Sequence, residues 1–388
     1  MSGPLSGIRV IEIAGIGPGP FCAMVLADMG AEVLRVDRAA EVDDPAMATT
    51  AELLVKRGRR SVAVDLKNPE GAVAVLRLAE RADVLIEGFR PGVAERLGIG
   101  PDACLEANPR LVYGRMTGWG QTGPDALEPG HDLNYVAITG ALAAMGRPGE
   151  APAPPLNLVG DYGGGGMLLA VGVLAALLEA RTSGAGQVVD AAMADGAALL
   201  STVFFGMRDL GHWNEERGAN LIDGGAPFYD VYETSDGRHV SLGAIEPQFY
   251  AAMLRVLGLE DEAPADQMDT RAWPAFKRRV AAVVLTRTRD EWCAAMEGAG
   301  ACFAPVLTFD EARTYPANVA RERFVEHGGF VQPAPAPRFG RTPSAIAAPA
   351  PLPGEHTEAA LASWGFTGPE IRALLDAGAV RAATTRDR

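Results

Sequence analysis

Ile8-Arg9-Val10-Ile11-Glu12-Ile13, followed by Gly15-Ile16-Gly17-Pro18-Gly19-Pro20, is the stretch that decides the fold. The first six residues have the length and the branched apolar side chains of a buried strand, and the second six are typical of a turn. A helical apolar pattern follows over Phe21–Met29, and Glu32–Val36 predicts a second strand. A strand, a helix and a strand in this order predict a βαβ unit with parallel strands.

The same alternation continues towards the middle of the chain. Glu70–Arg81 has the spacing of a helix, Ala82–Ile86 that of a strand, and Leu111–Tyr113 begins another strand. We therefore expect an α/β fold, in which residues 1–210 form a large domain around a parallel sheet with helices on its faces. A length of 388 residues, with 48% hydrophobic and 22% charged residues, suits a globular protein of two domains.

The periodicity changes after residue 227. Phe228–Glu233 and His239–Leu242 are strand patterns joined by Ser235-Asp236-Gly237, and together they predict a hairpin. Helical patterns follow, and Thr288 with Glu291 forms a capping box that predicts the start of another helix.

Domain boundaries follow from these patterns. We expect residues 211–226 to be a linker and residues 227–305 to be a smaller α+β domain inserted in the large one. Residues 306–388 then return to the large domain, with an extended strap at Pro333–Pro353 and a last helix capped at Thr367.

Composition and charge exclude several classes of function. A net charge of −14 disfavours a nucleic-acid partner, which requires a basic surface. The four cysteines are far apart, which excludes a disulfide scaffold and a structural zinc site and suits a reducing cytoplasm. The N-terminus has no secretory signal, and the apolar run Gly163–Leu178 is too short to span a bilayer. We expect a cytoplasmic protein with no membrane partner.

A dinucleotide fingerprint is suggested by Gly15, Gly17 and Gly19 after the first strand, with Asp37 at the end of the second. The fingerprint requires a third glycine where the helix packs on the strand, and Pro20 occupies that position. The sequence therefore favours an ordinary strand-to-helix turn over NAD binding.

Basic residues are concentrated in a few places of this acidic chain. Arg38 follows the second strand, at a place that suits a phosphate monoester. The other cations are Lys56, Arg57, Arg59, Arg60, Lys67, Arg90 and Arg96. Because an acidic protein needs a local positive patch to hold a polyanion, this set predicts a site for a phosphate-rich cofactor.

Two residues are candidates for proton transfer. His131 lies between glycine and polar residues in a loop after a predicted strand, which favours a functional role. Asp161 precedes Gly163–Gly166 at the start of an apolar helix. The glycines weaken the helix, and we expect them to let a ligand approach N–H groups that stabilise an oxyanion.

Several longer motifs carry a specific resemblance over nearly the whole chain. The N-terminal strand–turn–helix, Gly88-Phe89-Arg90-Pro91-Gly92, the Thr117–Pro124 loop, Asp161 with its glycines and Gly354-Glu355-His356-Thr357 resemble the class III CoA-transferase family. Within that family, Gly130-His131-Asp132-Leu133-Asn134-Tyr135, Pro155–Asp161 and Gly243–Tyr250 are similar to the α-methylacyl-CoA racemase branch.

The resemblance implies a racemase that inverts C2 of 2-methyl-branched acyl-CoA thioesters. His131 and Asp161 would lie on opposite sides of C2 and exchange a proton through an enolate. Glu246 would pair with His131, and Asn157 and Tyr135 would be supporting hydrogen-bonding groups. This proton transfer requires no metal and no redox cofactor.

The resemblance also implies a CoA site and a partner. The CoA-binding positions that it implies are Arg38, Val64, Asp65, Leu66, Lys67, Gly88, Phe89, Arg90, Pro91, Gly92, Arg96, Met116, Thr117, Gly118, Trp119, Gly120 and Gln121. The expected assembly is an interlocked homodimer, in which Glu246 acts either in its own chain or across the dimer. The acyl chain, and which base serves which enantiomer, stay open.

Three other functions remain as alternatives. A CoA-transferase of the same fold would use Asp161 as a nucleophile, but it would not need His131 and Glu246. A CoA-binding module without catalysis would have little use for these three residues together. An NADP-dependent oxidoreductase is disfavoured by Pro20.

Overall fold

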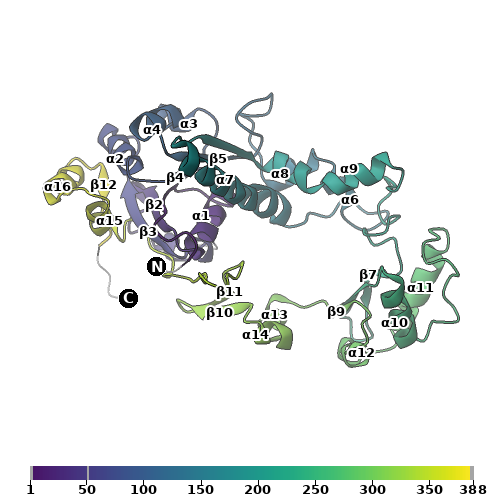
Figure 1. The fold of residues 1–388 in the computed structure, drawn as a ribbon. Helices are drawn as coiled ribbons and strands as arrows, with labels where there is room; N and C mark the ends of the chain where they lie inside the picture. Colours follow the sequence, from purple (N-terminus) through teal and green to yellow (C-terminus); the bar gives the residue numbers. More distant parts are fainter. Residues whose placement is uncertain (1–2, 50–51, 385–388) are drawn as a thin grey trace. The chain divides into compact units, whose positions relative to one another are not determined.

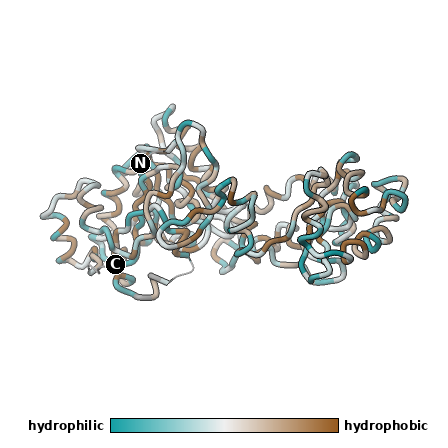
Figure 2. Tube along the Cα trace, turned by 90° about the horizontal axis from the view of Figure 1, so that it is seen from below, coloured by the Kyte–Doolittle hydropathy of each residue, from teal (hydrophilic) through white to brown (hydrophobic). Residues whose placement is uncertain are grey.

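The structure is a computed structural model that describes residues 3–49 and 52–384 of the chain. It consists of two compact units, one formed by residues 1–139, 156–200 and 319–388 and the other by residues 140–155 and 201–318. Each unit has its own hydrophobic core. Figure 2 shows brown, hydrophobic segments within each of them.

The first unit is built on a seven-stranded sheet with the strand order β12-β3-β2-β1-β4-β5-β6 (Figure 1). Strands β1 to β6 are parallel, and β12 pairs with β3 in the antiparallel direction. The strands are β1 (Arg9–Ile13), β2 (Glu32–Arg38), β3 (Arg59–Val64), β4 (Val84–Glu87), β5 (Val112–Thr117), β6 (Val188–Ala192) and β12 (Val380–Arg381). This arrangement confirms the predicted α/β fold. Strand β3 was not among the predicted strands.

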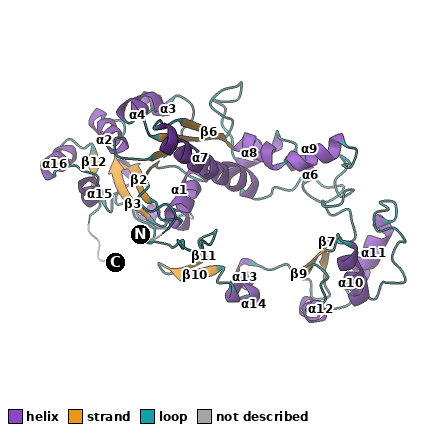
Figure 3. Cartoon of the chain, viewed as in Figure 1, coloured by secondary structure: helices purple, strands orange, loops and turns teal. Residues whose placement is uncertain are grey.

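Helices cover both faces of the sheet, and Figure 3 shows them in purple beside the orange strands. Along β1, Val10 faces α1 (Pro18–Asp28) and α7 (Leu168–Ser183), whereas Ile11 faces the opposite layer. That second layer contains α2 (Pro69–Ala79), α4 (Pro101–Ala107), α15 (Thr357–Ser363) and α16 (Gly368–Asp376). Both faces of a parallel sheet are therefore buried, which explains the nearly continuous apolar strands.

Shorter elements complete the first unit. They are the 3₁₀ turns η1 (Ala39–Glu41), η2 (Pro45–Ala48) and η3 (Leu54–Lys56), the helices α3 (Val93–Arg96), α5 (Asp132–Ala137) and α8 (Met193–Leu200), and the hairpin β10 (Phe324–His327) with β11 (Phe330–Pro333). The predicted strap is confirmed, because residues 334–356 contain neither helix nor strand. Two backbone hydrogen bonds connect the strap to the rest of the first unit. Gly58 N donates to Ala348 O, and Ala345 N donates to Asp28 O.

The longest helix has two parts with different hydrogen bonding. A π-helix, η4 (Leu158–Met167), continues directly into α7, so that the helix extends from Leu158 to Ser183 over 26 residues. By length and composition alone this segment is able to cross a membrane, whereas the predicted apolar run Gly163–Leu178 is shorter than the helix to which it belongs. Leu169 and Val173 are fully buried against the sheet, and a core helix passes the same test.

The second unit contains a three-stranded antiparallel sheet, β7 (Tyr229–Glu233), β8 (His239–Gly243) and β9 (Phe303–Pro305). The predicted hairpin is confirmed as β7–β8. The helices of this unit are α6 (Ala141–Ala144), α9 (Thr202–Asp209), α10 (Pro247–Leu257), α11 (Trp273–Val284), α12 (Arg289–Met296) and α13 (Phe309–Thr314), and α14 (Pro316–Ala320) lies at its boundary. Thr288 and Glu291 form the predicted capping box.

The second unit is larger than the predicted domain at 227–305. It also includes residues 140–155, because Arg147 pairs with Asp230 at 2.7 Å and Arg217 donates to the carbonyl oxygens of Ala143 and Glu150. Residues 140–155, which fall within the predicted large domain at 1–210, therefore belong to the second unit.

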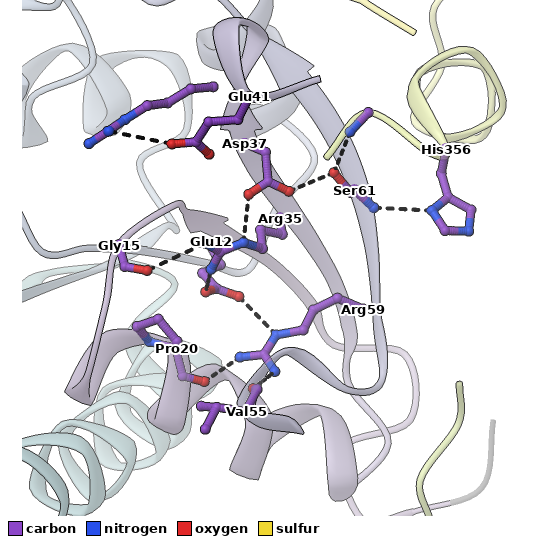
Figure 4. Close-up of polar contacts among 12 residues, drawn as sticks. Glu12, Gly15, Pro20, Arg35, Asp37, Glu41, Val55, Arg59, Ser61 and His356 are labelled. Carbon is purple, nitrogen blue, oxygen red and sulfur yellow. Dashed lines mark hydrogen bonds and ion pairs between the residues drawn. The ribbon is translucent and has the colours of Figure 1, made fainter. Parts of the chain in front are cut away.

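Buried ion pairs connect the first three strands (Figure 4). Arg59 Nε donates to Glu12 Oε2 at 2.9 Å, and Arg35 bonds both Glu12 and Asp37. Asp37 also accepts from Ser61 Oγ at 2.6 Å. Burial alone would raise the pKa of Glu12, but the two guanidinium groups outweigh burial and hold that pKa below its usual range.

These pairs correct part of the predicted phosphate patch. Arg59 is 1% exposed, and Arg57, which is 4% exposed, bonds Asp28 and Gln332. Arg60 pairs with Glu32. The prediction that this cluster forms a surface for phosphates is therefore wrong for Arg57 and Arg59, because acidic partners distant in the sequence neutralise and bury them.

Candidate active site

The carboxyl ends of β1 to β6 lie at one edge of the sheet, because these strands are parallel. The strand order reverses between β1 and β4, and in open α/β sheets ligands bind outside the carboxyl ends at such a point. Nearly all of the predicted site residues lie at the carboxyl ends of β2, β3, β4 and β5 or in the segments that follow these strands. The topology therefore places them at one edge.

Asp161 lies half-buried in η4, beside the turn after β1. Its Oδ2 accepts a hydrogen bond from Asn157 Nδ2 at 3.1 Å. Gly17 has φ +70°, and a Cβ on it would lie 3.2 Å from Asp161 Oδ2. Glycine at this position therefore gives the turn its left-handed conformation and leaves the space beside the carboxylate free.

His131 is the residue that precedes helix α5, and its side chain is exposed. Its backbone N–H donates to Asn134 Oδ1 at 3.0 Å, which closes the first turn of the helix. The next residue, Asp132, is buried and accepts the backbone N–H of Asp161 through Oδ1 at 2.6 Å. This contact connects the helix that begins beside His131 with the helix that carries Asp161.

Tyr135 is packed on the loop after β5. Its ring meets that of Trp119 edge-on, with centroids 4.7 Å apart, and its hydroxyl donates to Gly130 O. A Cβ on Gly118 would lie 2.1 Å from the Tyr135 ring, so only glycine fits beneath it. The loop is therefore shaped around this aromatic pair.

The pKa of Asp161 is raised above its ordinary value. Burial is the main cause, and the carboxylates of Asp132 and Glu52 add to it. The hydrogen bond from Asn157 and the charge of His131 act in the opposite direction. A carboxyl group with a raised pKa is a better acceptor and donor of protons near neutral pH than an ordinary aspartate.

The glycines after Asp161 have a different role from the predicted one. They lie inside η4, and a Cβ on Gly164 would lie 2.7 Å from Ala197 N, while one on Gly166 would lie 2.8 Å from Pro18 O. Close packing of η4 against α8 and α1 thus requires glycine. The prediction that these residues offer free N–H groups to a ligand is wrong, because they are interior residues of a hydrogen-bonded helix.

The predicted CoA-binding residues fall into two groups. Val64 and Met116 are 2% and 3% exposed, and Leu66 and Phe89 pack against a hydrophobic core. Exposed groups at the same edge are Arg38, Lys67, Gly88, Arg90 and Arg96. In the described part of the chain, Lys67, Arg90 and Arg96 form no ion pair, and Arg38 is 3.4 Å from Glu41 with 70% of its side chain exposed.

Hydrogen bonds donated by backbone N–H groups hold several of the other predicted CoA-binding residues in place. Asp65 Oδ1 accepts from Lys67 N, and Thr117 Oγ1 accepts from Gly120 N, both at 3.0 Å. Gln121 N donates to Asp190 Oδ2 at 3.2 Å. Pro91 and Gly92 precede α3, where Gly92 has φ +80°. These loops are thus defined by their own hydrogen bonds.

Glu246 belongs to the second unit, where it is exposed and precedes helix α10. Its backbone oxygen accepts from Phe249 N and Tyr250 N. Its pairing with His131 stays a prediction, because the two residues belong to different units.

Two site residues were missed by the sequence analysis. Asp132 was quoted only as part of a motif, although a carboxylate directly after His131 was a visible signal. Glu52 bonds Gly17 N through Oε1 at 3.0 Å, and no local pattern indicated this contact across 35 positions. Across residues 3–49 and 52–384, no three His, Cys, Asp or Glu side chains gather as a metal site requires.

The similarity of the sequence to known proteins shows which family the chain belongs to. The profile of CoA-transferase family III matches residues 5–357, and the chain belongs to that family. Similar proteins include the alpha-methylacyl-CoA racemases of Mus musculus and Homo sapiens, which are 46% and 44% identical over 372 residues. Each of these matches covers 95% of this chain and 96% of the relative.

More distant relatives share the fold. The human succinyl-CoA:glutarate CoA-transferase is 28% identical, with 91% of this chain and 84% of that protein covered. A crystal structure of a Mycobacterium tuberculosis protein matches with a TM-score of 0.77 and 30% identity, over 92% of this chain and 99% of the other. A CaiB/BaiF family protein from Brucella suis has a TM-score of 0.80 at 22% identity, over 94% and 100%. The expected class III CoA-transferase fold is confirmed.

Proposed function

We propose that this protein is an α-methylacyl-CoA racemase, which inverts C2 of 2-methyl-branched acyl-CoA thioesters. The observation that supports the proposal most strongly is its identity of 44–46% to two such racemases over 95% of the chain. The site adds a chemical argument. Asp161 is a half-buried carboxyl group with a raised pKa, and it lies near enough to His131 for that charge to act on it.

The reaction is two proton transfers at one carbon. One group removes the proton from C2, and the electron pair of the C–H bond moves into the thioester as an enolate. The other group then donates a proton to the opposite face of C2. We assign these roles to His131 and Asp161, with Asn157 orienting the carboxylate through its hydrogen bond to Oδ2.

The exposed cations at the carboxyl edge suit the phosphates of CoA. Arg38 ends β2, Lys67 follows β3, Arg90 and Arg96 follow β4, and all four are exposed. In a chain with a net charge of −14, these side chains provide the local attraction that a polyanionic substrate needs. We propose that they hold the nucleotide end of the substrate while the thioester reaches Asp161.

We further propose that the protein is a homodimer in which Glu246 supports His131. Exposed apolar side chains on the first unit support self-association, since Leu158, Val171 and Leu199 are each 58–59% exposed. Mixing a His131→Ala chain with a Glu246→Gln chain tests which chain supplies Glu246. If it acts across the dimer, each mixed dimer keeps one intact site, and an equal mixture, of which about half are mixed dimers, recovers about a quarter of wild-type activity. If it acts within one chain, no activity returns.

The decisive experiment follows deuterium at C2 by NMR. Purified protein is incubated in deuterated buffer with one enantiomer of 2-methyldecanoyl-CoA and no acceptor acid. We expect deuterium at C2 and the formation of both epimers. His131→Ala and Asp161→Asn should each lower the rate by about 10²–10⁴-fold, while His212→Ala, an exposed histidine of the second unit, should not change it.

A different outcome would identify a CoA-transferase. If C2 does not exchange but CoA moves to an added dicarboxylic acid, Asp161 is a nucleophile that carries an acyl intermediate. Loss of transfer in Asp161→Asn, with His131→Ala still active, would establish that alternative.

A further inference from the structure

The carboxylate of Asp132 has no role in the proton transfer proposed above, yet it is part of the site. It directly follows His131, is 7% exposed, and accepts the backbone N–H of Asp161 at 2.6 Å. Hydrogen bonds to a charged acceptor are shorter and stronger than neutral ones. This bond joins the first residue of α5 to the π-helix that carries Asp161.

The contact depends on a glycine that leaves room for it. A Cβ on Gly160 would lie 2.5 Å from Asp132 Oδ1 and 3.2 Å from Val136 Cγ2. The residue before Asp161 therefore has to be glycine for the two helices to approach this closely. Asp132 and Gly160 together define the separation of the two helix starts.

The second carboxylate oxygen of Asp132 indicates that accepting the N–H of Asp161 is not the whole role of this side chain. Oδ2 is buried and, among the described residues, has no hydrogen-bond partner. An unpaired buried polar atom is costly, and an asparagine would accept the same N–H without a buried charge. The negative charge itself therefore requires an explanation, and the carboxyl group of Asp161, whose own backbone N–H is bonded to Asp132, is an ionisable group on which that charge acts.

We propose that Asp132 is a positioning residue, which ties Asp161 to the start of α5 and so fixes it relative to His131. This inference rests on the proposed racemase function. A proton has to leave one face of C2 and arrive at the other, so the relative placement of the two groups controls the rate.

Electrostatics support the same role. The groups that act on Asp161 are Asp132 and His131 at the start of α5, Glu52 before η3, and Asn157 in the turn before η4. Burial is the main cause of the raised pKa of the Tyr135 hydroxyl, and the charge of Asp161 adds to it. Among these groups, Asp132 is the carboxylate that contacts Asp161 directly, and its charge helps to keep the pKa of Asp161 raised.

Two variants separate position from charge. Asp132→Ala removes the hydrogen bond and the charge, and kcat should fall about 10²-fold because a misplaced group is a poor base. KM should stay nearly unchanged, since the exposed cations that we assign to CoA lie in other loops. Asp132→Asn keeps an acceptor for the N–H of Asp161, and it should recover most of kcat while moving the acidic limb of the kcat/KM profile to lower pH. Asp195→Asn, on the exposed face of α8, is the matched control. It should change neither kcat nor the position of the acidic limb.

The measurement is C2 deuterium exchange with (S)-2-methyldecanoyl-CoA across a pH series. Wild-type protein that does not exchange would overturn the proposed function itself. Wild-type exchange together with an Asp132→Ala kcat within about threefold of it would overturn the positioning role alone. If Asp132→Ala does not fold, the Asn variant decides: a kcat far below that of wild type, although the amide oxygen still accepts the N–H of Asp161, would overturn the positioning role.

Discussion

Two groups of cations in the first unit differ in their surroundings. Arg57 and Arg59 are buried and bond Asp28 and Glu12, so their charges are neutralised inside the protein. Arg90 and Arg96 are exposed and, among the described residues, form no ion pair. The first group stabilises the fold, and the second remains available to an anion. A cluster of arginines in a sequence thus says little about function until its partners are known.

The difference follows from where each group lies on the sheet. Arg59 is the first residue of β3 and Arg57 precedes it, at the amino end of the strand, where α1 and the strap cover them. Arg90 follows β4 at the carboxyl end. In a parallel α/β sheet that end is left open for ligands, which gives the two sets opposite roles.

The largest effect should come from Glu12→Ala, which tests the buried group. The substitution leaves Arg35 and Arg59 without the carboxylate they share, and removing one member of a buried ion pair costs about 3–5 kcal/mol. Urea unfolding followed by circular dichroism measures the loss. Glu370→Gln, at an exposed pair with Arg77, should lose far less. A loss for Glu12→Ala as small as that of the control would refute the structural role of this network.

The second-largest effect should be a loss of stability that tests the packing of α8 against the π-helix η4. A Cβ on Gly196 would lie 1.9 Å from Gly164 O, so Gly196→Ala should destabilise the protein by about 1–3 kcal/mol or more through overpacking. Gly19→Ala is the control, because a Cβ there meets no atom within 4 Å, and it should be neutral or slightly stabilising. Equal thermal stability of the two variants would favour the earlier interpretation of the glycines as ligand-facing.

A smaller effect separates the two groups of arginines directly. Arg38→Ala removes an exposed cation and should raise KM for the acyl-CoA about tenfold with kcat little changed, as loss of one charged hydrogen bond predicts. Arg60→Ala removes a cation of the former cluster that is paired with Glu32, and KM should change less than about twofold. Steady-state kinetics on both enantiomers provides the measurement. Similar increases in KM for the two variants would show that Arg60 contacts the substrate despite its ion pair with Glu32.

The smallest effect is a shift of the pH profile. The active form of a His131–Asp161 pair holds one proton, so kcat/KM should be bell-shaped and alike for both enantiomers. As the pH falls through the pKa of Asp161, a second proton binds and activity is lost. Because burial raises that pKa, the acidic limb should lie above the range of an ordinary aspartate. An acidic limb at the ordinary value would contradict the buried character of this site.

Local patterns predicted much of the fold. The strands β1 and β2, the hairpin β7–β8 and the capping boxes at Thr288 and Thr367 were all visible, because each depends on residues close together in the chain. Strand β3 was missed because it begins with Arg59 and Arg60, which resemble a surface segment. Glu12, 47 positions away, is what allows Arg59 to be buried.

The candidate site was likewise predictable only where it depends on residues close together in the chain. His131 and Asp161 were predicted from their motifs and lie near the same edge of the sheet. The π-helix was not predictable, since the glycines inside it have close contacts with α1 and α8 that no short pattern encodes. The contact of Asp132 with Asp161 spans 29 positions, and only the folded chain brings these residues together.

The discontinuity of the first unit has a consequence for synthesis on the ribosome. Its sheet begins with Arg9 but is completed by β12 at Val380, which pairs with β3. All of residues 140–155 and 201–318 therefore leave the exit tunnel before that last strand exists, and the second unit is able to fold first. Until Val380 emerges, the outer edge of β3 lacks its partner and is open to other strands. A nascent chain stalled before Val380 would thus have a complete second unit and a first sheet with an open edge at β3.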